Sequence, residues 1–243
     1  MAILNIETAT SVCSVSLSEN GRVLFEKNSF DGPSHASLLG VFIEEVARIC
    51  NPCVTVHTDY KSARADIVDA VAVSSGPGSY TGLRIGVSMA KGLCFGWNVP
   101  LLNIPTLDIL AWKAIQLTGG ESPDVLFCAM IDARRMEVYT AIYDCTLRKI
   151  QETEAVVVTE NSFSSYLEKQ KIYFFGNGAA KCKSLIHSAN AIFIDDLHPL
   201  AADMAGLSEQ AYSNKRFEDV AYFEPFYLKD FIATTPKNLV MSK

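Results

Sequence analysis

No apolar run in this sequence approaches the roughly 18 residues that a membrane-spanning helix needs. The N-terminus, MAILNIETAT, carries no basic residue, and Glu7 interrupts its apolar start, so we expect no signal peptide. The 7 cysteines are odd in number and scattered, which is typical of reduced thiols rather than of a disulfide framework. Together these absences predict a cytoplasmic protein without a membrane partner.

Basic residues are fewer than acidic residues in this sequence. The 243 residues carry a formal net charge of −6, and no stretch interleaves Lys or Arg with aromatic residues. This balance argues against a stand-alone nucleic-acid-binding protein, which usually has a basic face. With 49% hydrophobic and 20% charged residues, the chain has the composition of a globular protein of one or two domains.

Familiar catalytic and metal-binding motifs are missing as well. No Lys follows the glycines as it does in a Walker motif, and no Ser-His-Asp set is discernible from spacing. Cys50-Asn-Pro-Cys53, followed by His57, has partial zinc-site spacing, but a structural zinc needs four ligands and no second pair exists. We interpret this segment as a helix-end loop with free thiols, and we predict no metal site.

The sequence does contain the same order of elements twice: three strands, a helix, a strand, a glycine turn and a helix. The first copy covers 3–6, 12–17, 22–28, 34–50, 68–73 and 81–96, and the second covers 125–131, 136–143, 147–158, 161–169, 172–175 and 179–188. A strand at 98–102 and helices at 105–118 and 200–212 complete the pattern. This duplication predicts an α/β actin-like (ribonuclease H-like, ASKHA) fold with two related halves, the second reduced.

The domain boundaries follow from this pattern and from a linker candidate at 118–124, TGGESPD. We place an N-terminal domain at residues 1–107 and a smaller C-terminal domain at 108–215. Residues 216–230 are aromatic enough to return to the first domain, and residues 231–243 are expected to form a flexible tail.

Two turns of the first half are candidates for contact with a nucleotide or phosphate. In the first hairpin turn, the hydroxyl and backbone N–H groups of Thr8, Thr10 and Ser11 can bind an oxyanion. Gly76 and Gly78 would form the matching loop after the buried strand. A hydroxyl-rich turn that holds no ligand explains the same residues equally well.

The predicted helix at 81–96 has small residues at four-residue spacing on one face, with Ser88, Gly92 and Gly96 in a second row beside them. Each interior helix glycine costs roughly 0.5–1 kcal/mol, which close approach of another helix would offset. The helix at 34–50 also has a wider apolar arc than one sheet contact needs. We predict a partner interface formed by His35, Leu38, Leu39, Phe42, Gly82, Leu83, Gly86 and Ala90. Gly86→Leu is then expected to abolish partner binding.

Several stretches resemble the TsaB (YeaZ) family over nearly the whole chain. The most specific is GPGSYTGLRIG (76–86), followed by AKGL (90–93) and IPTLDILA (104–111). NIETATSVCSVSL (5–17), SHASLL (34–39), IDARRMEVYTAIY (131–143) and PFYLKD (225–230) agree with it. The resemblance implies a cytoplasmic, non-catalytic subunit of the bacterial machinery that makes threonylcarbamoyladenosine in tRNA.

The same resemblance implies the partners. It predicts a heterodimer with the catalytic subunit TsaD, which transfers threonylcarbamoyl to an adenosine beside the anticodon, and a homodimer when the chain is alone. A TsaE-like ATPase belongs to the full complex, and tRNA is reached only through that complex. No cofactor is expected to bind tightly to this chain alone, whereas ATP or ADP is compatible with the assembly.

The catalytic relative carries two metal-binding histidines four residues apart, and the matching positions here are Ile104 and Asp108. Isoleucine cannot be a ligand, and one carboxylate makes a poor site, so we expect no transferase or peptidase activity. Two alternatives stay open. One is a glycoprotease-like metallopeptidase, which the missing histidines disfavour. The other is a stand-alone actin-like ATPase, although Glu7 stands where nucleotide-using members usually have Asp.

Overall fold

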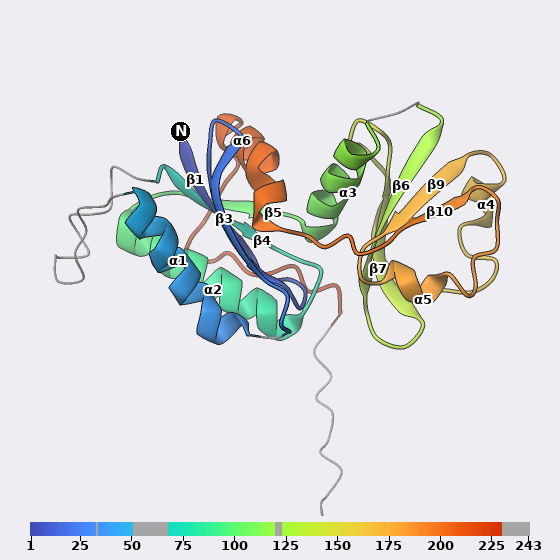
Figure 1. Cartoon of the computed structure of the whole chain (residues 1–243), viewed down its shortest axis with the longest axis horizontal. Helices are drawn as coiled ribbons and strands as arrows, with labels where there is room; N and C mark the ends of the chain where they lie inside the picture. Colours follow the sequence, from blue (N-terminus) through green and yellow to red (C-terminus); the bar gives the residue numbers. More distant parts are fainter. Residues whose placement is uncertain (33, 51–67, 120–122, 230–243) are drawn as a thin grey trace, which may run out of the picture.

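The computed structural model describes residues 1–32, 34–50, 68–119 and 123–229. It shows two α/β halves side by side, each built on one twisted sheet (Figure 1). The Cys53 and His57 side chains of the predicted free-thiol loop lie outside the described residues, as does the predicted tail at 231–243. No helix in the described ranges is long and apolar enough to cross a membrane.

The first sheet has six strands in the order β11-β5-β4-β1-β2-β3. Its strands are β1 (Ala2–Glu7), β2 (Cys13–Glu19), β3 (Arg22–Ser29), β4 (Ala70–Ser74), β5 (Leu101–Ile104) and β11 (Phe217–Glu218). β1, β2 and β3 form an antiparallel meander, while β1 pairs in parallel with β4 and β4 with β5. β4 (AVAVS) is buried along its whole length because helices cover both faces of the sheet.

The helices α1 (His35–Cys50) and α2 (Tyr80–Trp97) lie together on one face of this sheet (Figure 1). α2 begins where the Ser79 side chain accepts a hydrogen bond from the Gly82 N–H, and it ends at Asn98 in the left-handed conformation. The opposite face is covered by a 3₁₀ turn, η1 (Ala201–Met204), and by α6 (Ala205–Ser213). The candidate turns therefore lie at the ends of a sheet that is covered on both faces.

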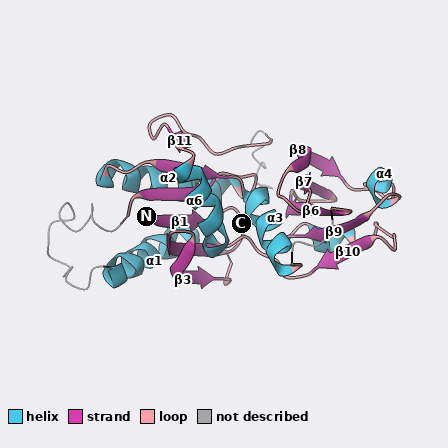
Figure 2. Cartoon of the chain, turned by 90° about the horizontal axis from the view of Figure 1, so that it is seen from above, coloured by secondary structure: helices cyan, strands magenta, loops and turns pink. Residues whose placement is uncertain are grey.

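The second sheet has five strands in the order β10-β9-β6-β7-β8. Its strands are β6 (Val125–Asp132), β7 (Glu137–Tyr143), β8 (Lys149–Val157), β9 (Lys171–Phe175) and β10 (Ala191–Ile194). Figure 2 shows α3 (Thr106–Leu117) between the two halves. Most of its buried side chains pack on the second sheet, while Ile109 joins the core of the first.

The structure differs from the predicted boundaries at three places. η1 and α6 fall within the predicted second domain (108–215) but pack on the first sheet, because Met204, Leu207 and Ala211 complete its apolar layer. The helices predicted at 161–169 and 179–188 are shorter in the structure, where they are α4 (Ser164–Leu167) and α5 (Ala179–Cys182). The second half is thus smaller than the first, and the overall architecture is the predicted actin-like α/β fold.

Candidate functional site

The first small row of α2 faces the chain's own hairpin turn. A Cβ atom at Gly82 would overlap the Thr8 carbonyl oxygen, and one at Gly86 would overlap the Thr8 hydroxyl oxygen. That hydroxyl donates a hydrogen bond of 2.8 Å to the Gly82 carbonyl. The close backbone approach that the glycines permit is therefore intramolecular, between α2 and the turn that joins β1 to β2.

This geometry corrects the predicted partner interface. All but Leu38 of the eight predicted residues are buried in the chain itself; Leu39 and Leu83 are 1% exposed and Ala90 is 0% exposed. They are core residues because α1 and α2 turn their apolar faces to the first sheet. Gly86→Leu would consequently disturb folding before it could affect a partner, so it is not a valid test of binding.

His35 ties the start of α1 to the same turn. Its ring is 4% exposed, and its Nε2 lies 2.9 Å from the Thr10 carbonyl oxygen. The lone histidine of the helix is thus a buried link between α1 and the hairpin turn rather than a surface residue.

The predicted phosphate-contacting residues lie on two turns whose groups mostly contact other parts of the chain. Ser79 N–H donates to the Ala9 carbonyl at 2.6 Å, and a Cβ at Gly78 would overlap that carbonyl. Thr8 and Thr10 are buried, and only Ser11 of the three hydroxyl residues is exposed. The turn is therefore closed on the side of α2, because the Thr8 hydroxyl and the Ala9 and Thr10 carbonyls already have partners in the chain.

A C-terminal segment, residues 219–229, closes the other loop; we call it the strap. The Phe226 N–H donates to the Ser75 carbonyl at 2.7 Å, and its carbonyl oxygen would lie 2.7 Å from a Cβ at Gly76. Gly76 has a φ of +108°, and its N–H donates to the Thr106 hydroxyl at 3.1 Å. The loop that was a candidate for phosphate contact is thus occupied by the strap and by the start of α3.

Glu7 is the titratable group at the centre of this region. Its side chain is 0% exposed; Oε1 accepts the Ala9 N–H at 2.5 Å, whereas Oε2 has no partner among the described residues. Desolvation by burial raises its pKa to about 8, against the smaller lowering effects of hydrogen bonds from Ser74 and Ala9. With a pKa of about 8, the Glu7 carboxyl keeps its proton at neutral pH and holds the hairpin turn through the Ala9 N–H.

The two positions matched to the catalytic histidines have other roles. Ile104 is 2% exposed and belongs to the apolar layer under α6. Asp108 Oδ1 accepts a hydrogen bond of 2.7 Å from the Tyr143 hydroxyl and lies 3.3 Å from Lys149 Nζ. Burial, with the nearby Asp108 charge, raises the pKa of Tyr143 well above its usual range, so the phenol remains a donor. Among the described residues, no group of three His, Cys, Asp or Glu side chains could hold a metal ion.

The outer surface of α1 and α2 is the feature that the predicted residue set missed. We define the outer face as the exposed residues Ser37, Gly40, Val41, Thr81, Ser88, Gly92, Phe95 and Gly96. Val41 is 48% exposed and Phe95 is 86% exposed, while a Cβ at Gly92 or Gly96 would meet nothing within 4 Å. In the sequence this face corresponds to the second row of small residues, Ser88, Gly92 and Gly96. Periodicity alone does not show which of the two rows faces the sheet.

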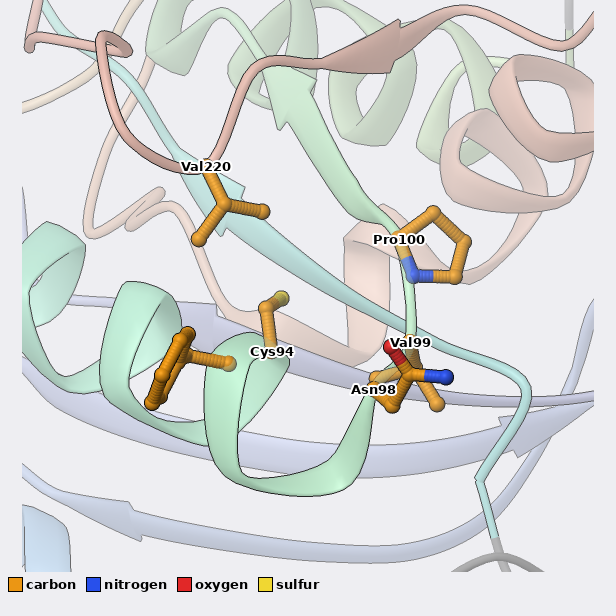
Figure 3. Close-up of a pocket in the computed structure, with 6 residues that line it drawn as sticks. Cys94, Asn98, Val99, Pro100 and Val220 are labelled. Atoms are coloured by element: carbon orange, nitrogen blue, oxygen red, sulfur yellow. The ribbon is translucent and has the colours of Figure 1, made fainter.

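A pocket of about 410 Å³ adjoins this face at the end of α2 (Figure 3). It is lined by Cys94, Phe95, Asn98, Val99, Pro100 and Val220. Lys91 Nζ holds the neighbouring strap through the Ala221 and Phe223 carbonyl oxygens, at 3.0 and 3.1 Å. A hollow with both polar and apolar lining therefore lies beside Phe95, the aromatic side chain of the face.

Most of the chain matches a known family of transferases. The family model TsaD: tRNA N6-adenosine threonylcarbamoyltransferase matches residues 44–237. However, the transferase of Staphylococcus aureus, 34% identical over 170 residues, matches only 61% of this chain and 50% of its own length. The chain therefore belongs to the TsaD-related class. It matches this particular transferase, however, over only part of either sequence.

The particular family is shown by relatives that match from end to end. The tRNA threonylcarbamoyladenosine biosynthesis protein TsaB of Escherichia coli is 31% identical over 239 residues, with 96% of both chains covered. TsaB of Bacillus subtilis is 28% identical, with 94% of each covered. The solved structure of YeaZ from Pseudomonas aeruginosa has a TM-score of 0.75 at 25% identity, covering 93% of this chain and 99% of that one. The chain belongs to the TsaB family.

Proposed function

We propose that this chain is a non-catalytic docking and activating subunit for a TsaD-like transferase in tRNA threonylcarbamoyladenosine biosynthesis. The names of its full-length relatives support the process. The docking role is supported by the outer face of α1 and α2.

The observation that carries the docking proposal is the contrast between the two glycine rows of α2. Gly82 and Gly86 are explained by the Thr8 turn, which needs their space. Gly92 has open space around its Cβ position, so nothing in the described chain offsets the roughly 0.5–1 kcal/mol that a helix glycine costs. A partner backbone packing closely on Gly92, with Phe95 in a partner pocket, would offset that cost.

The lack of catalysis is supported by the Asp108 contacts. A carboxylate held by Tyr143 and Lys149 is unlike a free metal ligand, and the neighbouring Ile104 side chain has no donor atom. This arrangement disfavours the metallopeptidase alternative. The stand-alone ATPase alternative is disfavoured by the strap over Gly76 and by the complete burial of the Glu7 side chain. ATP or ADP is proposed only within the full complex.

The outer face also supports self-association when the partner is missing. Its exposed valine, phenylalanine and glycines are equally suited to a second copy of α1 and α2, so we propose a homodimer that exchanges for the heterodimer. A TsaE-like ATPase joining the complex, and a cytoplasmic location, complete the proposal.

The test of the function is co-expression of this chain with a TsaD-like subunit. We expect the two to co-purify as a stable complex and the complex to modify tRNA, while the chain alone and the partner alone are inactive or nearly so. Modification at the full rate by the partner alone would contradict the activating role. Protease or ATPase turnover by the purified chain alone would contradict the assignment as a non-catalytic subunit.

Phe95→Ser is expected to weaken partner binding at least tenfold, because an 86% exposed aromatic beside a pocket has the features of an interface hot spot. The fold should be unaffected, since the side chain contributes little to the core. Titration calorimetry with the TsaD-like subunit measures the affinity. Leu117→Ser, at a 61% exposed position on α3, is the matched control and should bind normally.

A further inference from the structure

The turn between β6 and β7 has two consecutive arginines in a strained backbone conformation. Arg134 has a φ of +68° and Arg135 a φ of +50°, in the left-handed region that long side chains rarely adopt. Both are exposed. Asn or Gly would occupy these positions with less strain, so the backbone conformation does not explain the presence of two arginines.

Three neighbouring side chains build this turn. Asn177, in the loop after β9, accepts the Asp132 N–H at 2.9 Å. The Asp132 carboxylate accepts the Arg134 N–H at 3.0 Å. Lys181 of α5 donates to the Arg135 and Glu137 carbonyls, at 2.7 and 2.5 Å. The two arginines therefore project from a fixed backbone rather than from a loose loop.

The charges around the turn leave the arginines unneutralised. The carboxylates that flank the turn along the chain are each already paired: Asp132 with Lys181, and Glu137 with Lys229 of the strap. Neither arginine side chain has a hydrogen bond or ion pair among the described residues. On a chain with a net charge of −6, this turn is thus a local site with two uncompensated positive charges.

We propose that Arg134 and Arg135 form a contact site for the phosphate backbone of a structured RNA. The inference rests on the proposed function, because it makes the tRNA substrate of the complex the occupant and adds a direct contact by this chain. Guanidinium groups bind phosphate oxygens in a bidentate manner, and two of them on a fixed turn suit adjacent phosphates. Such a contact positions RNA without reading its sequence. A direct contact made within the complex agrees with the expectation that tRNA is reached only through that complex.

The experiment uses the complex of this chain with the TsaD-like subunit and an unmodified tRNA transcript. The key variant is Arg134→Asn/Arg135→Asn, which removes both charges and tolerates the left-handed angles. We expect tRNA affinity to fall about tenfold at moderate salt, and the slope of log affinity against log salt to become shallower by about one to two. The thermal midpoint of the chain should stay unchanged or rise. Arg134→Lys/Arg135→Lys should recover much of the salt dependence.

Two controls separate the outcomes. Arg148→Asn removes an exposed arginine of the same half that is paired with Asp144, and it should bind tRNA like the wild type. Normal tRNA affinity and salt slope in the double Asn variant would overturn the inference while the complex, and with it the proposed function, stands. Loss of the TsaD-like partner from that variant would also overturn it, because the turn would then bind an acidic protein surface. Failure of the wild-type chain to bind the partner would contradict the proposed function instead.

Discussion

Gly82→Ala is expected to lower the free energy of unfolding by about 2–4 kcal/mol, although alanine is the better helix former. The added methyl would overlap the Thr8 carbonyl oxygen, a backbone atom that cannot rotate away. The turn or the N-terminal half of α2 must then shift, which also weakens the hydrogen bond between the Thr8 hydroxyl and the Gly82 carbonyl.

Urea unfolding, followed by circular dichroism, measures this effect. Gly92→Ala is the matched control in the same helix, because its Cβ meets nothing within 4 Å. It should raise stability by up to about 1 kcal/mol through helix propensity alone. If both variants were equally stabilised, the assignment of the first glycine row to the internal turn would be wrong.

Because the pKa of Glu7 is raised in the folded state, the free energy of unfolding should fall as the pH rises from 4.5 to about 8. The unfolded carboxyl ionises near 4.5, whereas the buried one keeps its proton up to about 8, so the unfolded state binds fewer protons within this window. Below 4.5 both states are protonated and stability is at its highest; above 8 the loss is complete. Since one pKa unit corresponds to about 1.4 kcal/mol, the total loss is several kcal/mol.

Glu7→Gln isolates this contribution, because the amide oxygen can still accept the Ala9 N–H and the group does not ionise. We expect the variant to exceed the wild type in stability at pH 8 and to approach it at pH 4. Denaturant midpoints across this range give the difference curve, with the exposed Glu19→Gln as control. A constant difference between wild type and variant would show that the Glu7 carboxyl does not titrate in this window.

The order of elements could be read from the sequence because each half has strong local signals. The strands predicted at 12–17 and 22–28, the apolar run of β4 and the glycine turn before α2 all lie where the sequence pattern placed them. The two short strands β10 and β11 carry no such signal, since four and two residues give no period. Their place is set by pairing with β9 and β5, which depends on the tertiary fold.

The candidate site was less predictable for a specific physical reason. Spacing showed that α2 has two rows of small residues, but only the position of the Thr8 turn decides which row is internal. Likewise, the phosphate loop and the strap that covers it lie about 150 residues apart along the chain, so no local pattern joins Gly76 to Phe226. The sequence also does not show that Asp132 pairs with Lys181 or Glu137 with Lys229, because these partners lie far apart along the chain.

The most direct test of the docking account is co-purification of Gly92→Leu with the TsaD-like subunit. The leucine would stand in open space on the outer face, so the account predicts a folded protein with a thermal midpoint at or above that of the wild type. Its side chain would hold the partner backbone away, so no complex should be recovered. Gln116→Leu, at an exposed position of α3, should bind normally. A folded Gly92→Leu protein that co-purifies with the partner in wild-type yield would contradict the account.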